Sequence, residues 1–132
     1  MKQALAIDMG AIKNVTGIAT QGRAHSSEYV LEYRIQYGTN GKDWIDYKEV
    51  DGLPKLFRGN TDGDYVVRND FDQPIIAQWM RVNPTRWQDR ISLRVEVYGC
   101  DYIPDVLHFN GTALIRYTCA ICIYQKANQQ TS

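Results

Sequence analysis

The chain has 132 residues, and its length predicts a single domain that buries about 65–70% of the surface of its unfolded form. Its 15 basic and 15 acidic residues cancel, so the composition indicates no general attraction for nucleic acid or an anionic bilayer. No apolar stretch reaches the roughly 20 residues of a membrane-spanning helix, and the first residues lack the apolar core of a secretory signal. We therefore expect a domain that recognises its partners locally.

Strand patterns dominate the first half of the chain. Residues 4–9 (ALAIDM) alternate in polarity, and residues 15–21 (VTGIATQ) form a β-branched run. The clearest strand is residues 30–37, in which apolar and aromatic side chains occupy every second position. An Asn-Gly pair at residues 40–41 then predicts a hairpin turn, with a return strand that starts at Trp44.

The second half continues the same pattern with shorter segments. Turn signals at residues 51–54 and 60–64 separate strand-like runs, and residues 91–100 (ISLRVEVYGC) alternate regularly. No window shows a sustained helical period of apolar residues, and the aromatic and β-branched content suits pleated surfaces. The sequence therefore predicts an all-β fold, most simply a sandwich.

The three cysteines, Cys100, Cys119 and Cys122, are an odd number and cannot all pair within one chain. Cys119 and Cys122 form a CxxC pair, but zinc needs four ligands and neither histidine is placed to complete a set. The pair lies in an apolar run, LIRYTCAICIY, and not at the start of a helix, where a thioredoxin-like redox site would be. We interpret these two residues as buried or adventitious thiols, and expect no metal and no cofactor.

Three successive segments resemble the signatures of the discoidin domain, also called the coagulation factor V/VIII type C domain: residues 59–70 (GNTDGDYVVRND), 74–84 (PIIAQWMRVNP) and 91–100. Residues 4–100 are similar to the C-terminal two-thirds of such a domain. The chain looks most like the contactin-associated protein and neurexin IV group, because residues 104–117 (PDVLHFNGTALIRY) resemble the passage from discoidin into a laminin G domain there. The resemblance implies an all-β jelly-roll β-sandwich that is incomplete at its N-terminus.

The resemblance also implies a domain organisation. It divides the chain into a partial discoidin domain at residues 1–100, a linker at 101–117 that resembles the start of a laminin G domain, and an off-pattern tail at 118–132, which we expect to be disordered. Discoidin domains begin with a cysteine that bonds to the one at position 100, so the partner of Cys100 is expected to be absent. The group implies an extracellular domain of a membrane-anchored adhesion or receptor protein.

Loops at one end of a rigid sandwich are where such folds bind ligands. The loop at residues 21–29 (QGRAHSSEY) matches a projecting loop of the family. The candidate binding residues, which add one tryptophan from a later turn, are Arg23, His25, Ser26, Ser27, Glu28 and Trp87. Collagen-binding receptors carry an arginine after TQG, as Arg23 does here, whereas phospholipid-binding members carry large apolar residues in this loop.

The resemblance therefore favours a polar contact with a cell-surface or matrix protein or a glycan, such as a contactin-like adhesion protein. Collagen binding by a discoidin-receptor-like protein and phospholipid binding are the alternatives, and the polar loop disfavours membrane insertion. No nucleic-acid partner is expected. No catalytic motif or paired carboxylate spacing is present, so we do not expect an enzyme.

Some other residues allow a plainer interpretation. Trp44 and Trp79 lie in strand patterns and are expected to pack in the core, which leaves Trp87 as the exposed tryptophan. Arg81 and Arg90 are expected to form ion pairs, with partners from Asp70, Asp72 and Asp89.

Two Asn-X-Thr sequons, at Asn14 and Asn110, are consistent with export from the cell. Each three-residue match is a weak signal by itself. Asn110 lies in a turn-like segment, whereas Asn14 adjoins a strand, so we expect Asn110 to be the better acceptor for glycosylation.

Overall fold

The computed structural model of the chain describes residues 3–102 with their side chains, and the backbone of residues 106–109, 112–115 and 122–130. No α-helix occurs in these residues, which confirms the all-β prediction. The strands are β1 (Leu5–Gln21), β2 (Tyr29–Gly38), β3 (Ile45–Asp46), β4 (Phe57–Arg58), β5 (Val67–Gln88), β6 (Ser92–Asp101), β7 (Val106–Phe109), β8 (Thr112–Ile115) and β9 (Cys122–Gln130).

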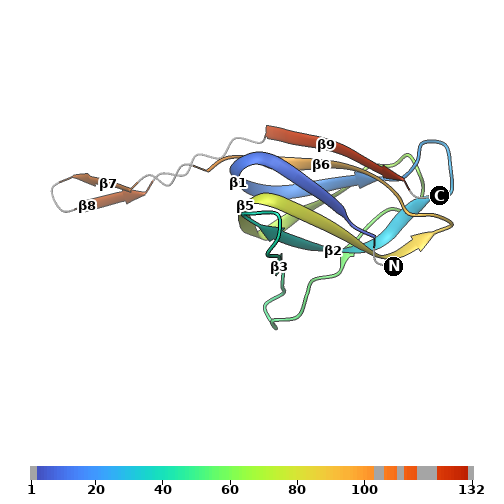
Figure 1. Cartoon of the computed structure of the whole chain (residues 1–132), viewed down its shortest axis with the longest axis horizontal. Coiled ribbons are helices and arrows are strands. Elements are labelled where there is room, and N and C mark those ends of the chain that lie inside the picture. The colour runs from blue at the N-terminus through green and yellow to red at the C-terminus, as the bar shows by residue number, and fades with distance from the viewer. Residues whose placement is uncertain (1–2, 103–105, 110–111, 116–121, 131–132) are drawn as a thin grey trace.

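The sandwich is built from two long strands, β1 and β5, that bend together and take part in both layers. Residues 5–8 of β1 pair with residues 79–82 of β5, which also pairs with β2. Beyond the bend, residues 13–20 of β1 pair with β5 on one side and with β6 on the other. Figure 1 shows β1 running from the N-terminal end, turning and running back. The order of the large sheet is β3-β2-β5-β1-β6-β9, with β4 paired to β2.

The bends occur where strand pairing is irregular. The register of β1 on β5 shifts between Asp8 and Lys13, and Gly10 in this interval has a φ of 82°, which favours glycine. Pro74 lies in β5 at a second register shift, and Pro84 lies opposite Tyr33 at a third. Because proline has no N–H to donate, these are the positions at which a long strand tolerates it.

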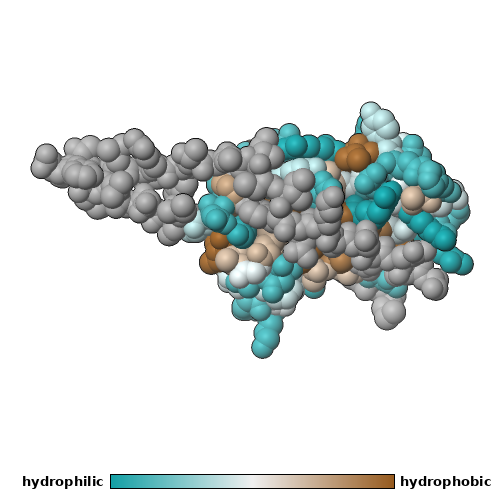
Figure 2. Space-filling model, turned by 90° about the horizontal axis from the view of Figure 1, so that it is seen from above, coloured by the Kyte–Doolittle hydropathy of each residue, from teal (hydrophilic) through white to brown (hydrophobic). Residues whose placement is uncertain are grey.

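The core lies between the two layers and is closed by an aromatic cluster. Tyr33 and Phe57 are stacked with ring centroids 5.4 Å apart, and Tyr47 and Phe71 contact Phe57 at 5.6 Å and 5.8 Å. The apolar side chains of β6 face this core and its charged side chains do not, as the alternation of residues 91–100 predicts. On the face seen in Figure 2, hydrophobic residues appear as small separated groups among hydrophilic ones.

The C-terminal segment differs from the expected disordered tail. Strand β9 pairs antiparallel with β6, from Ser92 opposite Gln130 to Gly99 opposite Cys122. The hairpin of β7 and β8 precedes it and extends away from the sandwich (Figure 1). Without β9, strand β6 would leave a row of backbone groups unpaired at the edge of the sheet, and pairing with β9 satisfies these groups.

Cys100 is disulfide-bonded and only 8% exposed. The sequence contains two other cysteines, Cys119 and Cys122, so the partner of Cys100 belongs to this chain. The prediction that this partner is absent is therefore wrong. The physical reason is the path of the C-terminal segment, which returns along β6 and places the backbone of Cys122 opposite Gly99.

Candidate functional site

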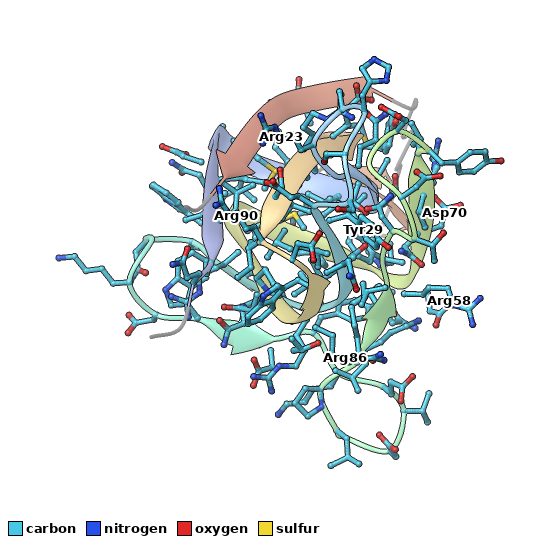
Figure 3. All side chains as sticks on the ribbon, turned by 90° about the vertical axis from the view of Figure 1, so that its right-hand side faces the viewer. Arg23, Tyr29, Arg58, Asp70, Arg86 and Arg90 are labelled. Atoms are coloured by element: carbon cyan, nitrogen blue, oxygen red, sulfur yellow. The ribbon has the colours of Figure 1, made fainter. Side chains whose placement is uncertain are left out.

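Three connections meet at one end of the sandwich, at the right of Figure 1 and facing the viewer in Figure 3. They are the β1–β2 loop (residues 22–28), the β4–β5 loop (residues 59–66) and the β5–β6 turn (residues 89–91). Hydrogen bonds join the first connection to each of the other two. We call these three connections together the end-loop surface.

The β1–β2 loop is shaped by its own hydrogen bonds. The backbone N–H of Arg23 donates to the carbonyl oxygen of Glu28 at 2.9 Å. The Ser26 hydroxyl donates to the carbonyl of Arg23 at 2.8 Å and accepts from the N–H of Glu28 at 3.1 Å. The Arg23 guanidinium lies 3.2 Å from the Glu28 carboxylate, with the two side chains 52% and 15% exposed. The loop therefore presents the arginine in a fixed place with much of its surface open to a partner.

The other two predicted loop residues connect the β1–β2 loop to its neighbours. His25 has a φ of 55°, and its backbone N–H donates to the Asp64 carboxylate at 2.9 Å while its imidazole is 91% exposed. The Ser27 hydroxyl donates to the carboxylate of Asp89, at 2.5 Å, in the β5–β6 turn. The structure thus brings Arg23, His25, Ser26, Ser27 and Glu28 together on one surface.

Arg94, a residue that sequence reasoning missed, holds the two longer loops side by side. Its Nε donates to the carbonyl of Gly22 at 2.6 Å, and its Nη2 donates to the carbonyl of Gly63 at 2.9 Å. The loops are so close that a Cβ on Gly63 would lie 2.0 Å from the carbonyl oxygen of Arg23. The alternation of residues 91–100 marks Arg94 as polar and outward-facing, but nothing local indicates these distant partners.

Asn60 anchors the β4–β5 loop to β1 and was also missed. Its side chain is buried, and its Nδ2 donates to the carbonyls of Thr20 and Tyr65, both at 2.9 Å. The Thr20 hydroxyl donates to the Asn60 Oδ1 at 2.8 Å. The ring of Tyr65 is 74% exposed beside this anchor, so the end-loop surface includes an aromatic group that the sequence did not single out.

Trp87 is exposed, as predicted, at 46% of its surface, but it is not brought together with the loop residues. It lies within β5 opposite Val30, and lines a cavity with side chains of β2 and β5. In Figure 3 its neighbour Arg86 lies on the opposite side of this end from Arg23. Trp44 and Trp79 are half-buried and lie outside the core, so the prediction for them is wrong.

The prediction of ion pairs for Arg81 and Arg90 is also wrong. Arg81 donates from Nε and Nη2 to the Gln36 side-chain oxygen, and its guanidinium lies 4.3 Å from the Trp44 ring centre. Arg90 forms no ion pair with any residue that the structure describes. The three acidic residues have other partners: Asp70 pairs with Arg68, Asp72 with Lys55, and Asp89 with Ser27.

Of the two sequons, Asn110 lies outside the described residues. Asn14 lies within β1, between β5 and β6, where it is opposite Ile76 and Cys100. Its side-chain oxygen is buried and has no hydrogen-bond partner. A glycan on Asn14 would therefore have to be accommodated against the sheet, and the expectation that Asn110 is the better acceptor stays a prediction.

The chemistry of the end-loop surface is that of polar recognition. It exposes a guanidinium, an imidazole and a phenol ring, and its carboxylates are engaged in hydrogen bonds within and between the loops. Within the described residues, no group of three or more His, Cys, Asp or Glu side chains is placed to hold a metal ion. The same part of the chain contains no helix long and apolar enough to cross a membrane.

Comparison with known proteins shows what this architecture is similar to. A family model described as the F5/8 type C domain matches residues 1–97. Neurexin-4 of Drosophila melanogaster is 53% identical over 113 residues, which cover 86% of this chain and 9% of that protein. Lactadherin of Bos taurus is 42% identical over 99 residues, which cover 73% of this chain and 23% of that protein. The chain thus spans less than a quarter of either relative.

The fold has solved counterparts as well. Discoidin II of Dictyostelium discoideum superposes with a TM-score of 0.68 and 25% sequence identity, over 77% of this chain and 39% of that chain. This likeness confirms the discoidin-type jelly-roll β-sandwich, and the match to Neurexin-4 confirms the predicted similarity to neurexin IV. The chain therefore belongs to the F5/8 type C, or discoidin, domain family.

Proposed function

We propose that this domain is an extracellular, non-enzymatic recognition module of an adhesion or receptor protein, and that its end-loop surface binds a protein or glycan partner. The observation that carries the proposal is the position of Arg23. Its guanidinium is held beside Glu28 with half of its surface exposed, on a loop that hydrogen bonds join to Asp64, Asp89 and Arg94 of other elements. Because little loop motion has to be lost on binding, such a preorganised arginine is an effective contact residue.

The chemistry of the surface favours a partner with mixed polarity. Arg23 offers bidentate donors to a carboxylate, and His25 and Tyr65 add exposed rings that can donate hydrogen bonds. A contactin-like adhesion protein of the cell surface fits the similarity to Neurexin-4. Triple-helical collagen is the alternative that the resemblance of Arg23 to the arginine of collagen-binding receptors suggests.

Phospholipid binding is the least supported alternative. The β1–β2 loop carries Arg23, His25 and two serines where insertion into a bilayer would need large apolar side chains. Tyr65 and Val66 are exposed on the neighbouring loop, but they are flanked by Asp62 and Asp64, which an anionic membrane would repel.

Binding of the purified domain to immobilised ectodomain of a contactin-type adhesion protein, measured by biolayer interferometry, tests the proposal. Triple-helical collagen and phosphatidylserine vesicles are measured in parallel. We expect Arg23→Ala to weaken protein binding about tenfold or more, as for a central interface arginine. Lys42→Ala is the matched control, because Lys42 is an exposed cation in the loop after β2, at the opposite end of that strand.

Two results would contradict the proposal. If Arg23→Ala binds as tightly as the wild type, the end-loop surface is not the binding site. If only the vesicles bind, and with unchanged affinity after Arg23→Ala, the domain is a lipid-binding module.

A further inference from the structure

A second polar site lies on the outer face of the sheet formed by β2 and β5. Arg34 is opposite Asn83, and Gln36 is opposite Arg81. The residues between them along each strand, among them Ile35 and Val82, are buried in the core, so these four side chains project outward. They line a cavity of about 360 Å³, together with Gln3, Pro84, Thr85, Trp87 and Ile91.

Arg81 is held in place by neutral groups. Its Nε and Nη2 donate to the Gln36 side-chain oxygen at 2.9 Å and 2.6 Å, and Asn83 donates to the same oxygen at 3.0 Å. The guanidinium also stacks 4.3 Å from the Trp44 ring centre. None of these contacts neutralises its charge.

Arg34 has even fewer partners. Its Nε is buried without a hydrogen-bond partner, and its guanidinium takes part in none of the ion pairs among the described residues. Leaving a buried donor unpaired is unfavourable, so a site of this kind calls for an acceptor from outside the fold.

The nearby acidic residues do not supply that acceptor. Glu32 accepts a hydrogen bond from the Thr85 hydroxyl at 2.8 Å, and Asp46 accepts one from the Gln36 amide at 2.8 Å. Both carboxylates are thus bound to neutral donors, and neither Glu32 nor Asp46 lines the cavity. Among the described residues, the cavity wall therefore contains two arginines and no carboxylate, which favours an anionic ligand.

Trp87 adds an apolar wall to this cationic cavity. Its ring is nearly half exposed, and the cavity is at the small end of the ~300–1,000 Å³ range of ligand pockets, which suits one sugar ring better than a peptide. A pyranose has an apolar face for an indole, hydroxyls for amide side chains and, when acidic, a carboxylate for guanidinium groups. We propose that this cavity binds an acidic monosaccharide unit, with its carboxylate on Arg34 and Arg81 and its ring against Trp87.

The cavity adjoins the end-loop surface at Ile91 but contains no residue of the β1–β2 loop, and the test separates the two sites. The probes are the methyl glycosides of N-acetylneuraminic acid and glucuronic acid, added to the isotope-labelled full chain and followed by NMR, including the indole N–H signals. Methyl galactoside and inorganic sulfate are the neutral-sugar and simple-anion controls. We expect saturable shifts with a Kd of about 1 mM, typical of a single sugar, for at least one acidic sugar.

Arg34→Gln is expected to weaken this binding about tenfold, because it removes the charge and the guanidinium donors and leaves a shorter polar side chain. Trp87→Ala is expected to abolish the shifts that the sugar ring induces. Arg23→Ala is the matched control and should leave sugar binding unchanged. Near-ultraviolet circular dichroism of each variant shows whether the fold is kept.

The proposal is overturned if neither acidic sugar causes shifts in the folded wild type. It is also overturned if sulfate binds as well as both sugars, or if Arg34→Gln and Trp87→Ala both bind as the wild type does. Partner binding at the end-loop surface is expected to survive Arg34→Gln, so either proposal can fail without the other.

Discussion

At the scale of single residues, Asn60 is a buried side chain that anchors the β4–β5 loop of the end-loop surface to β1. It makes three hydrogen bonds in a buried position, to Thr20 and to the carbonyl of Tyr65. We expect Asn60→Ala to lower the free energy of unfolding by about 2–4 kcal/mol, because the partners left behind each lose a buried hydrogen bond. Urea denaturation measures this change, and Thr61→Ala, at the exposed neighbour, should change it little. Equal stability of the two variants would show that the anchor is unimportant.

Because the phenol of Tyr33 is buried, we expect its ionisation to lower the free energy of unfolding at alkaline pH. Burial raises the pKa of its phenol well above the ordinary 10.0, and the hydrogen bond from Asn69, at 3.0 Å, opposes this shift only in part. Since the folded-state pKa is higher than the unfolded one, the stabilising contribution of the neutral phenol is complete below pH 10 or so. It is lost as the pH rises from there toward the folded-state pKa, by up to about 1.4 kcal/mol per pH unit.

Comparison of wild type with Tyr33→Phe, by urea denaturation between neutral and strongly alkaline pH, isolates this effect. The free energy of unfolding of the variant should fall less steeply above pH 10 or so, because one titrating group has been removed. Tyr65→Phe is the control, since its ring is exposed in the folded state. Parallel curves for wild type and Tyr33→Phe would show that Tyr33 ionises without opposing the fold.

At the scale of elements, the contact between the two longer end loops is tight enough to test with one methyl group. Gly63→Ala places a Cβ against the carbonyl oxygens of Arg23 and Ser26, at 2.0 Å and 2.8 Å, so one loop must move. We expect a loss of about 1–3 kcal/mol in unfolding free energy, together with weaker partner binding at Arg23. Gly52→Ala is the matched control, because it strains a distant turn at a φ of 85° and should leave partner binding intact.

If Gly63→Ala and Gly52→Ala affect partner binding equally, the close contact of the loops does not position Arg23. Hydrogen exchange of the amides in residues 22–28 provides a second readout. It should become faster in Gly63→Ala and stay unchanged in Gly52→Ala.

The elements also show which parts of the fold could be predicted from the sequence. In strand β6 the apolar residues Leu93, Val95 and Val97 are buried, as its alternation predicts. In strand β2 the alternation holds for Tyr33 and Ile35, but Val30 is buried where Leu31 was expected, because the register on β5 shifts just after Val30. Strands β1 and β5 pass between the two layers, where the buried face changes at the bend, and the sequence divides them into shorter runs. The two prolines of β5 lie at register shifts within a single strand.

In the candidate site, too, the parts built from local contacts could be predicted from the sequence, and the parts built from distant contacts could not. The β1–β2 loop was found because two clear strands flank it, and its internal hydrogen bonds span only a few residues. The contacts of Asn60 with Thr20 and of Arg94 with Gly22 join residues 40 and 72 positions apart. Such contacts depend on the folded arrangement of strands, and no local pattern encodes them. The partner of Cys100 was missed for the same reason, because it depends on the path of the C-terminal segment.

At the scale of the whole molecule, the C-terminal segment is attached to the sandwich by strand pairing and by a disulfide. Strand β9 covers the edge of β6, and Cys100 bonds within the chain. With either remaining cysteine the bond closes a loop of about 20 residues, for which the chain-entropy estimate is about 3 kcal/mol. Three tryptophans and nine tyrosines report on the packing of this domain, so a near-ultraviolet circular dichroism melt follows its unfolding.

We expect one cooperative transition for the oxidised chain, and the same transition at a lower Tm after reduction or in Cys100→Ser. The oxidised wild type should contain one free thiol, because the bond uses two of the three cysteines. Cys119→Ser and Cys122→Ser identify the partner, since the variant that lacks it should melt like Cys100→Ser while the other melts like the wild type. Three free thiols in the unreduced protein, or a Tm that reduction leaves unchanged, would mean that β9 is held by backbone pairing alone. In that case the edge of β6 would open on local unfolding and become available to the strands of other molecules.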